Sequence, residues 1–455
     1  MYYIGIDIGT TSICGIVSNM ENGQVVKSIT KQNESWVHTN NKWEKTQDPA
    51  VIYLIVIDIL NEFYTLNLDI NGIGITGQMH GILYVDADGN AVSNLFTWQD
   101  MRANLPYNDV DTYAGYLSSI TGYDVYPGFG LATHYYNIKN GLVPQNSRYI
   151  CTIPDYIAMK LAGTIKPICD ATMAASLGVF DLPLNNFNSL SLQKIGIDLN
   201  MLPKIVKSGT IIGYSQKSIP VAVAVGDNQA SILGAVKNID SSVLVNIGTG
   251  SQVSIYSHQY IEVPGLETRP FPGGGYIVVG APLTGGKSLA LLANFFNAVC
   301  KLFTDREAGN IYNIINSFDY SINSAEDMLK VNTQFMGTRQ NALARGSITN
   351  ISLENFTPEN ITVGFIEGMV SELYELYAAI PDKLRSNIKT LVGSGNAIRK
   401  NEIVKQAASE IFCLPVMIPK NQEEASFGAA LCCAVGTGYI RDFHSAGQVI
   451  AYTNE

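Results

Sequence analysis

A seven-residue pattern occurs twice in this chain, about half a chain length apart. The first copy is I-D-I-G-T-T-S at residues 6–12, and the second copy is V-N-I-G-T-G-S at residues 245–251. Each copy lies between two runs rich in β-branched residues, which is the pattern of a strand, a turn and a second strand. Repetition at this distance indicates that the chain consists of two related halves.

The segments around the two copies predict a similar alternation of strands and helices. In the first half, Asp48-Pro49 predicts the start of a helix that continues towards Tyr64. The strands expected there cover residues 3–8, 13–17, 25–29, 73–76 and 82–85. The second half predicts strands at 243–247, 252–256, 276–279 and 388–392, and helices from 288, within 358–380 and over 399–411. We therefore expect an α/β fold with a boundary near 237–242, which gives domains at 1–238 and 239–455.

Composition limits the classes of protein to consider. The chain has 455 residues, of which 46% are hydrophobic and only 15% are charged, so it can fill more than one buried core. Its 29 basic and 39 acidic side chains give a net charge of −10, and no cluster of Lys or Arg interrupts this balance. Nucleic acid is therefore not an expected partner, and neither is an anionic membrane surface.

Signals for membrane insertion and for disulfides are also missing from the sequence. The longest apolar run, residues 51–60, is too short to span a bilayer and contains Asp58, and the N-terminus lacks a basic region and a cleavage site. The seven cysteines include no C-x-x-C pair, which favours buried, reduced thiols over disulfides or a zinc site. We expect a cytoplasmic protein.

The two repeated turns are candidate phosphate sites. A strand-Gly-Thr-strand turn exposes consecutive backbone N–H groups beside hydroxyls, and the missing Cβ of glycine lets phosphate oxygens approach. The candidates are Gly9, Thr10, Thr11 and Ser12 in the first turn, and Gly248, Thr249 and Gly250 in the second. Asp7 precedes the first turn, where its carboxylate either holds Mg²⁺ or stabilises the turn itself.

Two more segments follow apolar strands. Asp227 comes directly after V-A-V-A-V-G at 221–226 and begins a helix of small residues, so it is either an N-cap or a general base. The segment G-S-G-N-A at 393–397 also lies between a strand and a helix, and it suits close backbone contact with a base or a phosphate.

A group of polar and aromatic side chains lies between these segments and the first turn. It combines amide, imidazole, indole, carboxylate and guanidinium groups, which together suit a polyol. Its members are Gln78, Met79, His80, Trp98, Asp100 and Arg102. The alternatives are that His80 has a purely structural role and that Trp98 belongs to the core.

The string A-P-L-T-G-G-K-S at 281–288 resembles the end of a Walker A loop. Alanine stands where the first glycine of such a loop is required, and Pro282 would stiffen it. We find no apolar strand downstream that ends in the Asp of a Walker B segment. A P-loop is therefore the weaker alternative.

Seven motifs in order identify a family. They are D-I-G-T-T-S, G-Q-M-H-G, W-Q-D-x-R, G-D-N-Q-A, N-I-G-T-G-S, G-S-G-N-A and E-E-A-S-F-G-A-A, and they extend over nearly the whole chain. This ordered set resembles the FGGY carbohydrate kinases. The resemblance implies two actin-like (ribonuclease H-like) ATPase domains with ATP and sugar in the cleft between them.

The resemblance also implies roles for single residues. Asp227 matches the catalytic base and also a substrate-binding position, and Asp7 matches the acid near Mg²⁺. Asp7 and Asp227 together are the implied metal positions. The positions that match the sugar pocket are Gln78, Met79, His80, Trp98, Asp100 and Arg102. Those that match the nucleotide site are Gly9, Thr10, Thr11, Ser12, Gly248, Thr249, Gly250, Gly285, Gly393, Gly395 and Asn396. ATP and Mg²⁺ are the implied cofactors.

Within the family, the Met79-His80 pair is typical of ketose kinases. The stretches T-R-P-F-P at 268–272 and G-F-G-x-A-T at 128–133 look more like sedoheptulokinases than xylulokinases. We therefore expect transfer of the γ-phosphoryl group of ATP to the terminal primary hydroxyl of a ketose, with sedoheptulose favoured and D-xylulose as the alternative. A P-loop NTPase and a non-catalytic actin-like sugar sensor are the rival classes, and we expect a monomer or a homodimer.

Overall fold

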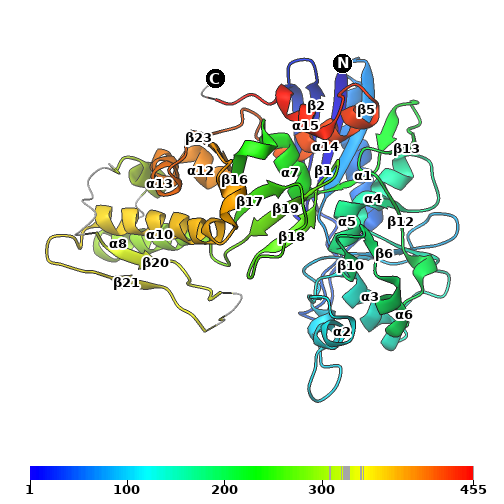
Figure 1. Cartoon of the computed structure of the whole chain (residues 1–455), viewed down its shortest axis with the longest axis horizontal. Helices are drawn as coiled ribbons and strands as arrows, with labels where there is room; N and C mark the ends of the chain where they lie inside the picture. The colour runs from blue at the N-terminus through cyan, green and yellow to red at the C-terminus, as the bar shows by residue number, and fades with distance from the viewer. Residues whose placement is uncertain are drawn as a thin grey trace. The chain divides into compact units, whose positions relative to one another are not determined.

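The computed structural model describes residues 1–453, apart from 249, 307–308, 319, 321–327, 339–340 and 342. The chain divides into two compact units, whose elements are labelled in Figure 1. The first unit comprises Met1–Lys237, Arg269–Gly275 and Asn421–Ile450, and the second comprises Asn238–Thr268, Tyr276–Lys420 and Ala451–Glu455. The predicted ranges 1–238 and 239–455 do not coincide with these units, because two later segments return to the first one.

The main sheet of the first unit has the strand order β13-β14-β5-β1-β2-β3. Strand β1 pairs antiparallel with β2 and parallel with β5, and a short strand, β15, also pairs parallel with β5. The bounds are β1 (Tyr2–Ile8), β2 (Ser12–Asn19), β3 (Gln24–Gln32), β5 (Ile70–Gly77), β13 (Ile211–Tyr214), β14 (Pro220–Ala222) and β15 (Val225–Gly226).

The main sheet of the second unit repeats this plan. Its order is β18-β19-β17-β16-β22-β23, with β16 antiparallel to β17 and parallel to β22. The bounds are β16 (Ser242–Ile247), β17 (Ser251–Ser257), β18 (Glu267–Pro270), β19 (Tyr276–Gly280), β22 (Thr390–Ser394) and β23 (Val416–Met417). Because β1, β2, β3, β5 and β14 correspond in order and direction to β16, β17, β19, β22 and β23, the predicted duplication is confirmed.

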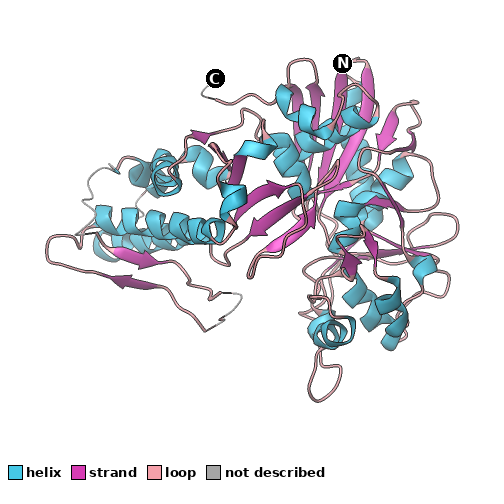
Figure 2. Ribbon diagram, in the orientation of Figure 1, coloured by secondary structure: helices cyan, strands magenta, loops and turns pink. Residues whose placement is uncertain are grey.

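Helices accompany the strands in each unit, as Figure 2 shows in cyan. Those of the first unit are α1 (Pro49–Tyr64), α2 (Tyr113–Thr121), α3 (Gly130–Lys139), α4 (Ile153–Leu161), α5 (Ala171–Ser176), α6 (Ser189–Lys194), α7 (Asp227–Ala235), α14 (Glu424–Gly436) and α15 (Phe443–Ala446). Those of the second unit are α8 (Lys287–Thr304), α9 (Ile311–Asn316), α10 (Pro358–Ala378), α11 (Asp382–Arg385), α12 (Asn396–Lys400) and α13 (Glu402–Phe412).

Short strand pairs lie outside the two main sheets. They are β4 (Thr46–Gln47) with β7 (Leu95–Phe96), β6 (Leu83–Val85) with β8 (Tyr149–Cys151), β9 (Ile168–Asp170) with β12 (Lys204–Val206), β10 (Phe180–Asp181) with β11 (Asn186–Phe187), and β20 (Lys330–Asn332) with β21 (Ser347–Thr349). The strand predicted at 82–85 is therefore present, but it belongs to one of these pairs.

The start of α1 was predictable from local chemistry. The Asp48 carboxylate accepts a hydrogen bond from the backbone N–H of Ala50 at 2.8 Å, and Pro49 occupies the first helical position. The buried face of the helix packs into the core of the sheet through Ile52, Val56, Ile59, Leu60 and Phe63.

One predicted helix is wrong. Residues 399–411 do not form a continuous helix, because Asn401 is extended (φ −119°, ψ 110°) between α12 and α13. The side-chain amide of Asn401 donates to the carbonyl oxygen of Ala397, the second residue of α12, at 2.7 Å. The strand predicted at 388–392 also begins two residues later, as β22.

Helix α14 comes from the end of the chain yet packs in the first unit. In Figure 1 this red helix lies beside the blue strand β1. A Cβ on Gly5 of β1 would lie 1.8 Å from the Ser426 carbonyl oxygen, and a Cβ on Gly74 of β5 would lie 1.8 Å from that of Ala429. Only glycine at these two strand positions lets the helix backbone approach the sheet so closely.

The same helix crosses α7 through a second glycine contact. A Cβ on Gly428 of α14 would lie 1.9 Å from the Ala230 carbonyl oxygen, and one on Gly234 of α7 would lie 2.0 Å from that of Glu424. Helix α14 thus connects the sheet to the helix that begins with Asp227.

Cysteine placement agrees only in part with prediction. All seven cysteines are unpaired, and Cys14, Cys151, Cys169, Cys432 and Cys433 are buried. Cys300 is half-buried, however, and Cys413 is exposed at the end of α13. Among the described residues, none of the helices combines the length and the apolar character that crossing a membrane requires.

We predict that Gly428→Ala lowers the free energy of unfolding by about 3 kcal/mol or more, because the new methyl group meets backbone that cannot rotate away. Urea denaturation of the whole chain measures this change. Gly115→Ala in α2 is the matched control, since the nearest atom to its Cβ lies 3.4 Å away. Equal stability of the two variants would contradict the tight α14–α7 contact.

Candidate active site

Three strands of the first unit end side by side. In the parallel pairing of β1, β5 and β15, Ile8 lies opposite Gly77, and Gly77 lies opposite Gly226. The segments that follow these strands contain Gly9, Gln78 and Asp227 respectively. Three predicted motifs therefore meet at the carboxyl ends of neighbouring parallel strands, where α/β proteins place their ligands.

The first repeated turn is held by side chains from four other segments. The indole Nε1 of Trp98 donates to Thr10 Oγ1 at 2.9 Å, and Gln47 Nε2 donates to the Thr10 carbonyl oxygen at 2.9 Å. Gln78 Nε2 donates to Gln47 Oε1 at 2.8 Å, and Asn33 Nδ2 donates to the carbonyl oxygen of Gly9 at 2.8 Å. Thr11 is exposed, and Ser12 begins β2.

Gln47 and Asn33 were not predicted. Asn33 directly follows β3, and Gln47 is the last residue of the short strand β4, and neither residue lies in a glycine-rich motif. Their role depends on contacts with residues 24 to 37 positions away, and short motifs carry no signal for such contacts.

Two carboxylates lie at this edge of the sheet. Burial, the negative charge of Asp227 and that of Glu423 raise the pKa of Asp7 to about 7. Burial also raises the pKa of Asp227 to about 6, while the backbone N–H of Asn228 and the charge of Arg269 act against this rise. Both acids are thus less acidic than ordinary aspartates, and a positive charge between them would relieve the repulsion.

The alternatives for these two acids can now be judged. Gly226, not Asp227, is the N-cap of α7, and Asp227 is its first helical residue. Asp7 lies within β1, paired with Cys14 and Thr76, and is not part of the turn. Asp227 is therefore not the N-cap, and Asp7 does not lie in the turn, although Asp227 Oδ1 accepts from the backbone N–H of Asn228 at 2.7 Å.

The Met79-His80 segment borders the strand that leads to Asp227. A Cβ on Gly226 would lie 2.8 Å from the sulfur of Met79, which is buried. The ring of His80 stacks on that of Phe129, with centroids 4.7 Å apart and planes inclined by 10°. His80 has a φ of 72°, a conformation that residues other than glycine rarely adopt.

Trp98 is not a core residue, because 46% of it is exposed. A Cβ on Gly128 would lie 2.0 Å from the Trp98 carbonyl oxygen, so the G-F-G stretch at 128–130 packs directly on this tryptophan. The indole thus presents a surface beside the first turn while its N–H is bonded to Thr10.

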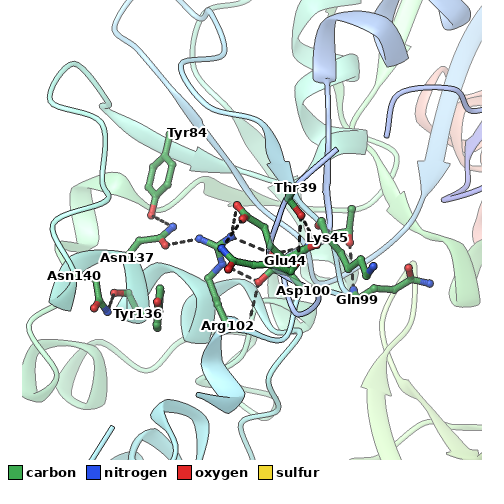
Figure 3. A network of polar contacts seen from close by, with 12 residues as sticks. Thr39, Glu44, Lys45, Tyr84, Gln99, Asp100, Arg102, Tyr136, Asn137 and Asn140 are labelled. Carbon is green, nitrogen blue, oxygen red and sulfur yellow. Dashed lines mark hydrogen bonds and ion pairs between the residues drawn. The ribbon is translucent and has the colours of Figure 1, made fainter. Parts of the chain in front are cut away.

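Asp100 and Arg102, predicted to contact a sugar, are buried and bonded to one another (Figure 3). Asp100 Oδ1 accepts from Arg102 Nε at 2.7 Å, and Oδ2 accepts from Nη2 at 3.0 Å. Oδ2 also accepts from the backbone N–H of Lys45, and Arg102 Nη1 donates to Asn137 Oδ1 at 2.8 Å. The guanidinium lies over the ring of Phe96, 4.0 Å from its centroid. We propose that this pair shapes the turn that carries Trp98.

The second unit brings together the predicted nucleotide segments. Asn246 Nδ2 donates to Ser394 Oγ at 2.7 Å, and a Cβ on Gly395 would lie 2.6 Å from the Ile247 carbonyl oxygen. A Cβ on Gly285 would lie 2.5 Å from Ser251 Oγ. Segments from three distant parts of the sequence therefore meet around the second repeated turn.

Not every predicted nucleotide residue belongs to this surface. Gly393 is buried inside β22, where a Cβ would lie 2.8 Å from a side-chain carbon of Ile418, so packing accounts for this glycine. Asn396 is exposed at the start of α12. Gly248 and Gly250 have room for a Cβ, and Thr249 lies outside the described residues.

Comparison with known protein families identifies the family of this chain. Residues 2–234 match the N-terminal domain of the FGGY family of carbohydrate kinases, and residues 243–437 match the C-terminal domain of that family. The chain belongs to the FGGY family of carbohydrate kinases. Its two α/β units agree with the two halves that the repeated motifs predicted and with the actin-like domains that the resemblance to this family implied.

Relatives within the FGGY family are distant but match over nearly their whole length. The chain is 28% identical to the sedoheptulokinase of Mus musculus over 474 residues, covering 94% of this chain and 96% of that protein. It is 26% identical to the xylulose kinase of Staphylococcus xylosus over 477 residues, covering 99% and 94% respectively.

Solved FGGY structures share the fold at lower identity. The xylulose kinase of Rhodospirillum rubrum superimposes with a TM-score of 0.83 at 19% identity, over 99% of this chain and 93% of that one. The glycerol kinase of Plasmodium falciparum with ADP superimposes with a TM-score of 0.81 at 19% identity, over 98% and 91%.

The P-loop alternative does not suit an FGGY kinase. The strand before A-P-L-T-G-G-K-S is β19, which pairs antiparallel with β17, whereas nucleotide-binding P-loops follow a strand of a parallel sheet. Lys287 begins α8, where it is exposed and its Nζ lies 3.5 Å from the sulfur of Met336.

We predict that Arg102→Ala lowers the free energy of unfolding by about 3–5 kcal/mol, because it leaves the buried Asp100 carboxylate without its cation. Urea denaturation measures the loss. Arg148→Ala, at an exposed arginine of the same unit, is the control and should change stability by less than about 0.5 kcal/mol. A stable Arg102→Ala protein with a raised KM for sugar would instead support direct contact with the substrate.

We predict that the metal-free protein loses stability as the pH rises from about 4 to about 7. The native state holds protons on Asp7 and Asp227 in this range, whereas the unfolded chain releases them at the ordinary pKa near 3.8. Asp7→Asn removes part of this dependence and should stabilise the protein at pH 8 by about 1–3 kcal/mol. Unfolding in urea with EDTA at several pH values measures it.

Asp124→Asn, at an exposed carboxylate, is the control for this comparison and should follow the wild-type pH dependence. If Asp7→Asn also follows the wild-type curve, the burial and repulsion described for Asp7 are wrong.

Proposed function

We propose that this FGGY kinase transfers the γ-phosphoryl group of ATP to the terminal primary hydroxyl of a ketose, with Asp227 as the general base. The observation that carries the proposal is the position of Asp227. It follows β15 directly, its strand contacts Met79, and its charge raises the pKa of Asp7. We call Met79, His80 and the G-F-G stretch at 128–130 the sugar wall. Asp227, the sugar wall and Asp7 thus lie at the same edge of the sheet.

Asp227 suits proton acceptance from an alcohol. A sugar hydroxyl is far too weak an acid to ionise near pH 7, so its proton must leave as attack on phosphorus proceeds. A carboxylate with a pKa of about 6 is still ionised near pH 7 and is a stronger base than an ordinary aspartate. General-base catalysis of this kind contributes a factor of about 10²–10⁴ in rate.

The residues around Asp7 fit a divalent cation. Mg²⁺ prefers carboxylate oxygens together with water and phosphate oxygens, and Asp7 and Asp227 supply two carboxylates that repel each other without a cation. Mg²⁺, when bound with ATP, neutralises charge on the phosphate groups. Asp7 and Asp227 would hold it, and the first turn at 9–12 offers backbone N–H groups to the phosphates.

The second unit supplies the proposed nucleotide surface. The turn at 248–250, Gly285 and the segment at 394–396 adjoin one another, and the glycines at 285 and 395 have no room for a side chain. The related glycerol kinase structure from Plasmodium falciparum contains ADP, which supports ATP as the phosphoryl donor here.

Sedoheptulose is the proposed acceptor. The sedoheptulokinase of Mus musculus is similar over almost the full length, and Met79-His80 together with the G-F-G stretch at 128–130 forms the wall described above. D-Xylulose is the second candidate, because the xylulose kinase of Staphylococcus xylosus is nearly as similar.

We predict that the protein consumes ATP faster with sedoheptulose than with xylulose, ribulose, fructose or glycerol. Asp227→Ala should lower kcat by at least about 10²-fold, because the hydroxyl loses its proton acceptor. A coupled ADP assay with mass spectrometry of the sugar phosphate measures both effects. Lys287→Ala is the control and should retain most activity.

Each alternative has its own outcome in this assay. Loss of activity in Lys287→Ala with full activity in Asp227→Ala would favour a P-loop. Nucleotide hydrolysis without any sugar phosphate would favour a sensor. A larger kcat/KM for xylulose would reassign the substrate and leave the reaction class unchanged.

A further inference from the structure

Helix α5 hydrogen-bonds to two separate parts of the proposed active site. This helix has only six residues, Ala171–Ser176, and it is almost entirely buried. One hydroxyl near its start bonds to the strand that leads to Asp227, and its last residue bonds to His80. The motifs that identified the site contain none of its residues.

The first connection passes through Thr172. The backbone N–H of Gly226 donates to Thr172 Oγ1 at 2.8 Å, and Thr172 Oγ1 donates to Asp170 Oδ1 at 2.6 Å. Because a backbone N–H can only donate, the Thr172 hydroxyl acts as acceptor there and must direct its own proton to Asp170. The direction of this chain of hydrogen bonds is thereby fixed.

Asp170 is well placed to accept this hydrogen bond from Thr172. It is fully buried, and its carboxylate also accepts from Ser208 Oγ at 2.6 Å and from the backbone N–H of Met173 at 3.0 Å. Burial raises the pKa of Asp170, and the hydrogen bonds from Ser208, Thr172 and Met173 oppose this rise while they hold the carboxyl group in one rotamer. Gly226 is therefore bonded to a rigid group, and Asp227 is the next residue.

The second connection passes through Ser176. The backbone N–H of His80 lies 3.1 Å from Ser176 Oγ, and His80 Nδ1 lies 2.8 Å from the Ser176 carbonyl oxygen. Since a carbonyl oxygen only accepts, Nδ1 carries the proton. Ser176 thus fixes the rare backbone conformation of His80, the orientation of its ring and its tautomer.

We propose that α5 is a positioning element with two separable effects, in which Thr172 fixes the backbone that carries the base and Ser176 fixes the sugar-binding His80. The inference rests on the proposed function. Thr172 and Ser176 act through Asp227 and His80 and do not themselves touch the substrate. Because a displacement of about 1 Å costs on the order of 10²-fold in rate, the two hydroxyls should have different kinetic signatures.

The test is a comparison of kcat and ketose KM in variants of the full chain. Thr172→Val should lower kcat by about 10–100-fold and change KM less than about twofold, because the base moves while the sugar wall remains. Ser176→Ala should raise KM by about 2–10-fold and change kcat less than about twofold, because one hydrogen bond to His80 is lost. Thr172→Ser keeps the hydroxyl and should restore kcat.

Buried hydroxyls away from the site are the controls. Thr152 bonds an aspartate, Asp155, at 2.6 Å, as Thr172 does. Ser191 Oγ donates to a backbone carbonyl oxygen, as Ser176 Oγ does to that of Met173 at 2.7 Å. Thr152→Val and Ser191→Ala should lower the melting temperature without separating kcat from KM. If Thr172→Val does not fold, Thr172→Ala removes the same hydroxyl from a smaller side chain.

The outcomes separate the two proposals. If wild-type protein phosphorylates no ketose, the proposed function is wrong and the inference falls with it. If wild type is active but Thr172→Val and Ser176→Ala change kcat and KM alike, in step with melting temperature, α5 has only a structural role and the inference is overturned.

Discussion

The close approach of α14 to the sheet of the first unit is the contact on which the active site depends. It is possible only because Gly5 and Gly74 carry no side chain on the face that meets the helix backbone. The same helix then packs on α7 through Gly428, and α7 begins with Asp227. The proposed general base is therefore held by backbone contacts, which yield less readily than contacts between side chains.

Two pairs of buried charged residues in the first unit differ in how their charges are compensated. Asp100 and Arg102 are joined by two hydrogen bonds, so each buried charge is neutralised by the other. Asp7 and Asp227 are both acids, and burial together with the nearby charge of Asp227 raises the pKa of Asp7. The charges of Asp100 and Arg102 compensate each other within the protein. The two negative charges of Asp7 and Asp227 are compensated only when a cation or protons bind, which is typical of groups that act on a ligand.

Local patterns were sufficient to predict much of the fold. The strands on both sides of each repeated turn alternate in the expected way, and Asp48-Pro49 marks the start of α1 because capping is a contact between near neighbours in sequence. Asp227 was selected as a candidate site residue because it directly follows an apolar strand, and its catalytic role is a proposal. Repetition at half-chain spacing, more than any single motif, predicted the two sheets.

Other features depend on contacts between distant residues and leave little trace in a short pattern. Gln47 contacts Thr10, and Thr172 contacts Gly226, across 37 and 54 positions of sequence. The break at Asn401 depends on one side-chain hydrogen bond inside a helical pattern. The return of α14 to the first unit could not be read from hydrophobic periodicity, since that helix is apolar and small-sided nearly all around.

That return affects how the protein is made. Helix α14 ends at Gly436, so at the ~5–20 residues per second of protein synthesis it emerges about 10–40 s after α7. During this interval the face of β1 and β5 that contains Gly5 and Gly74 is uncovered, because α14, the helix that packs on it, has not yet been synthesised. The nascent first unit therefore remains incomplete until residues 424–436 have left the ribosome, and a chain terminated before them would lack the helix that supports the proposed catalytic base.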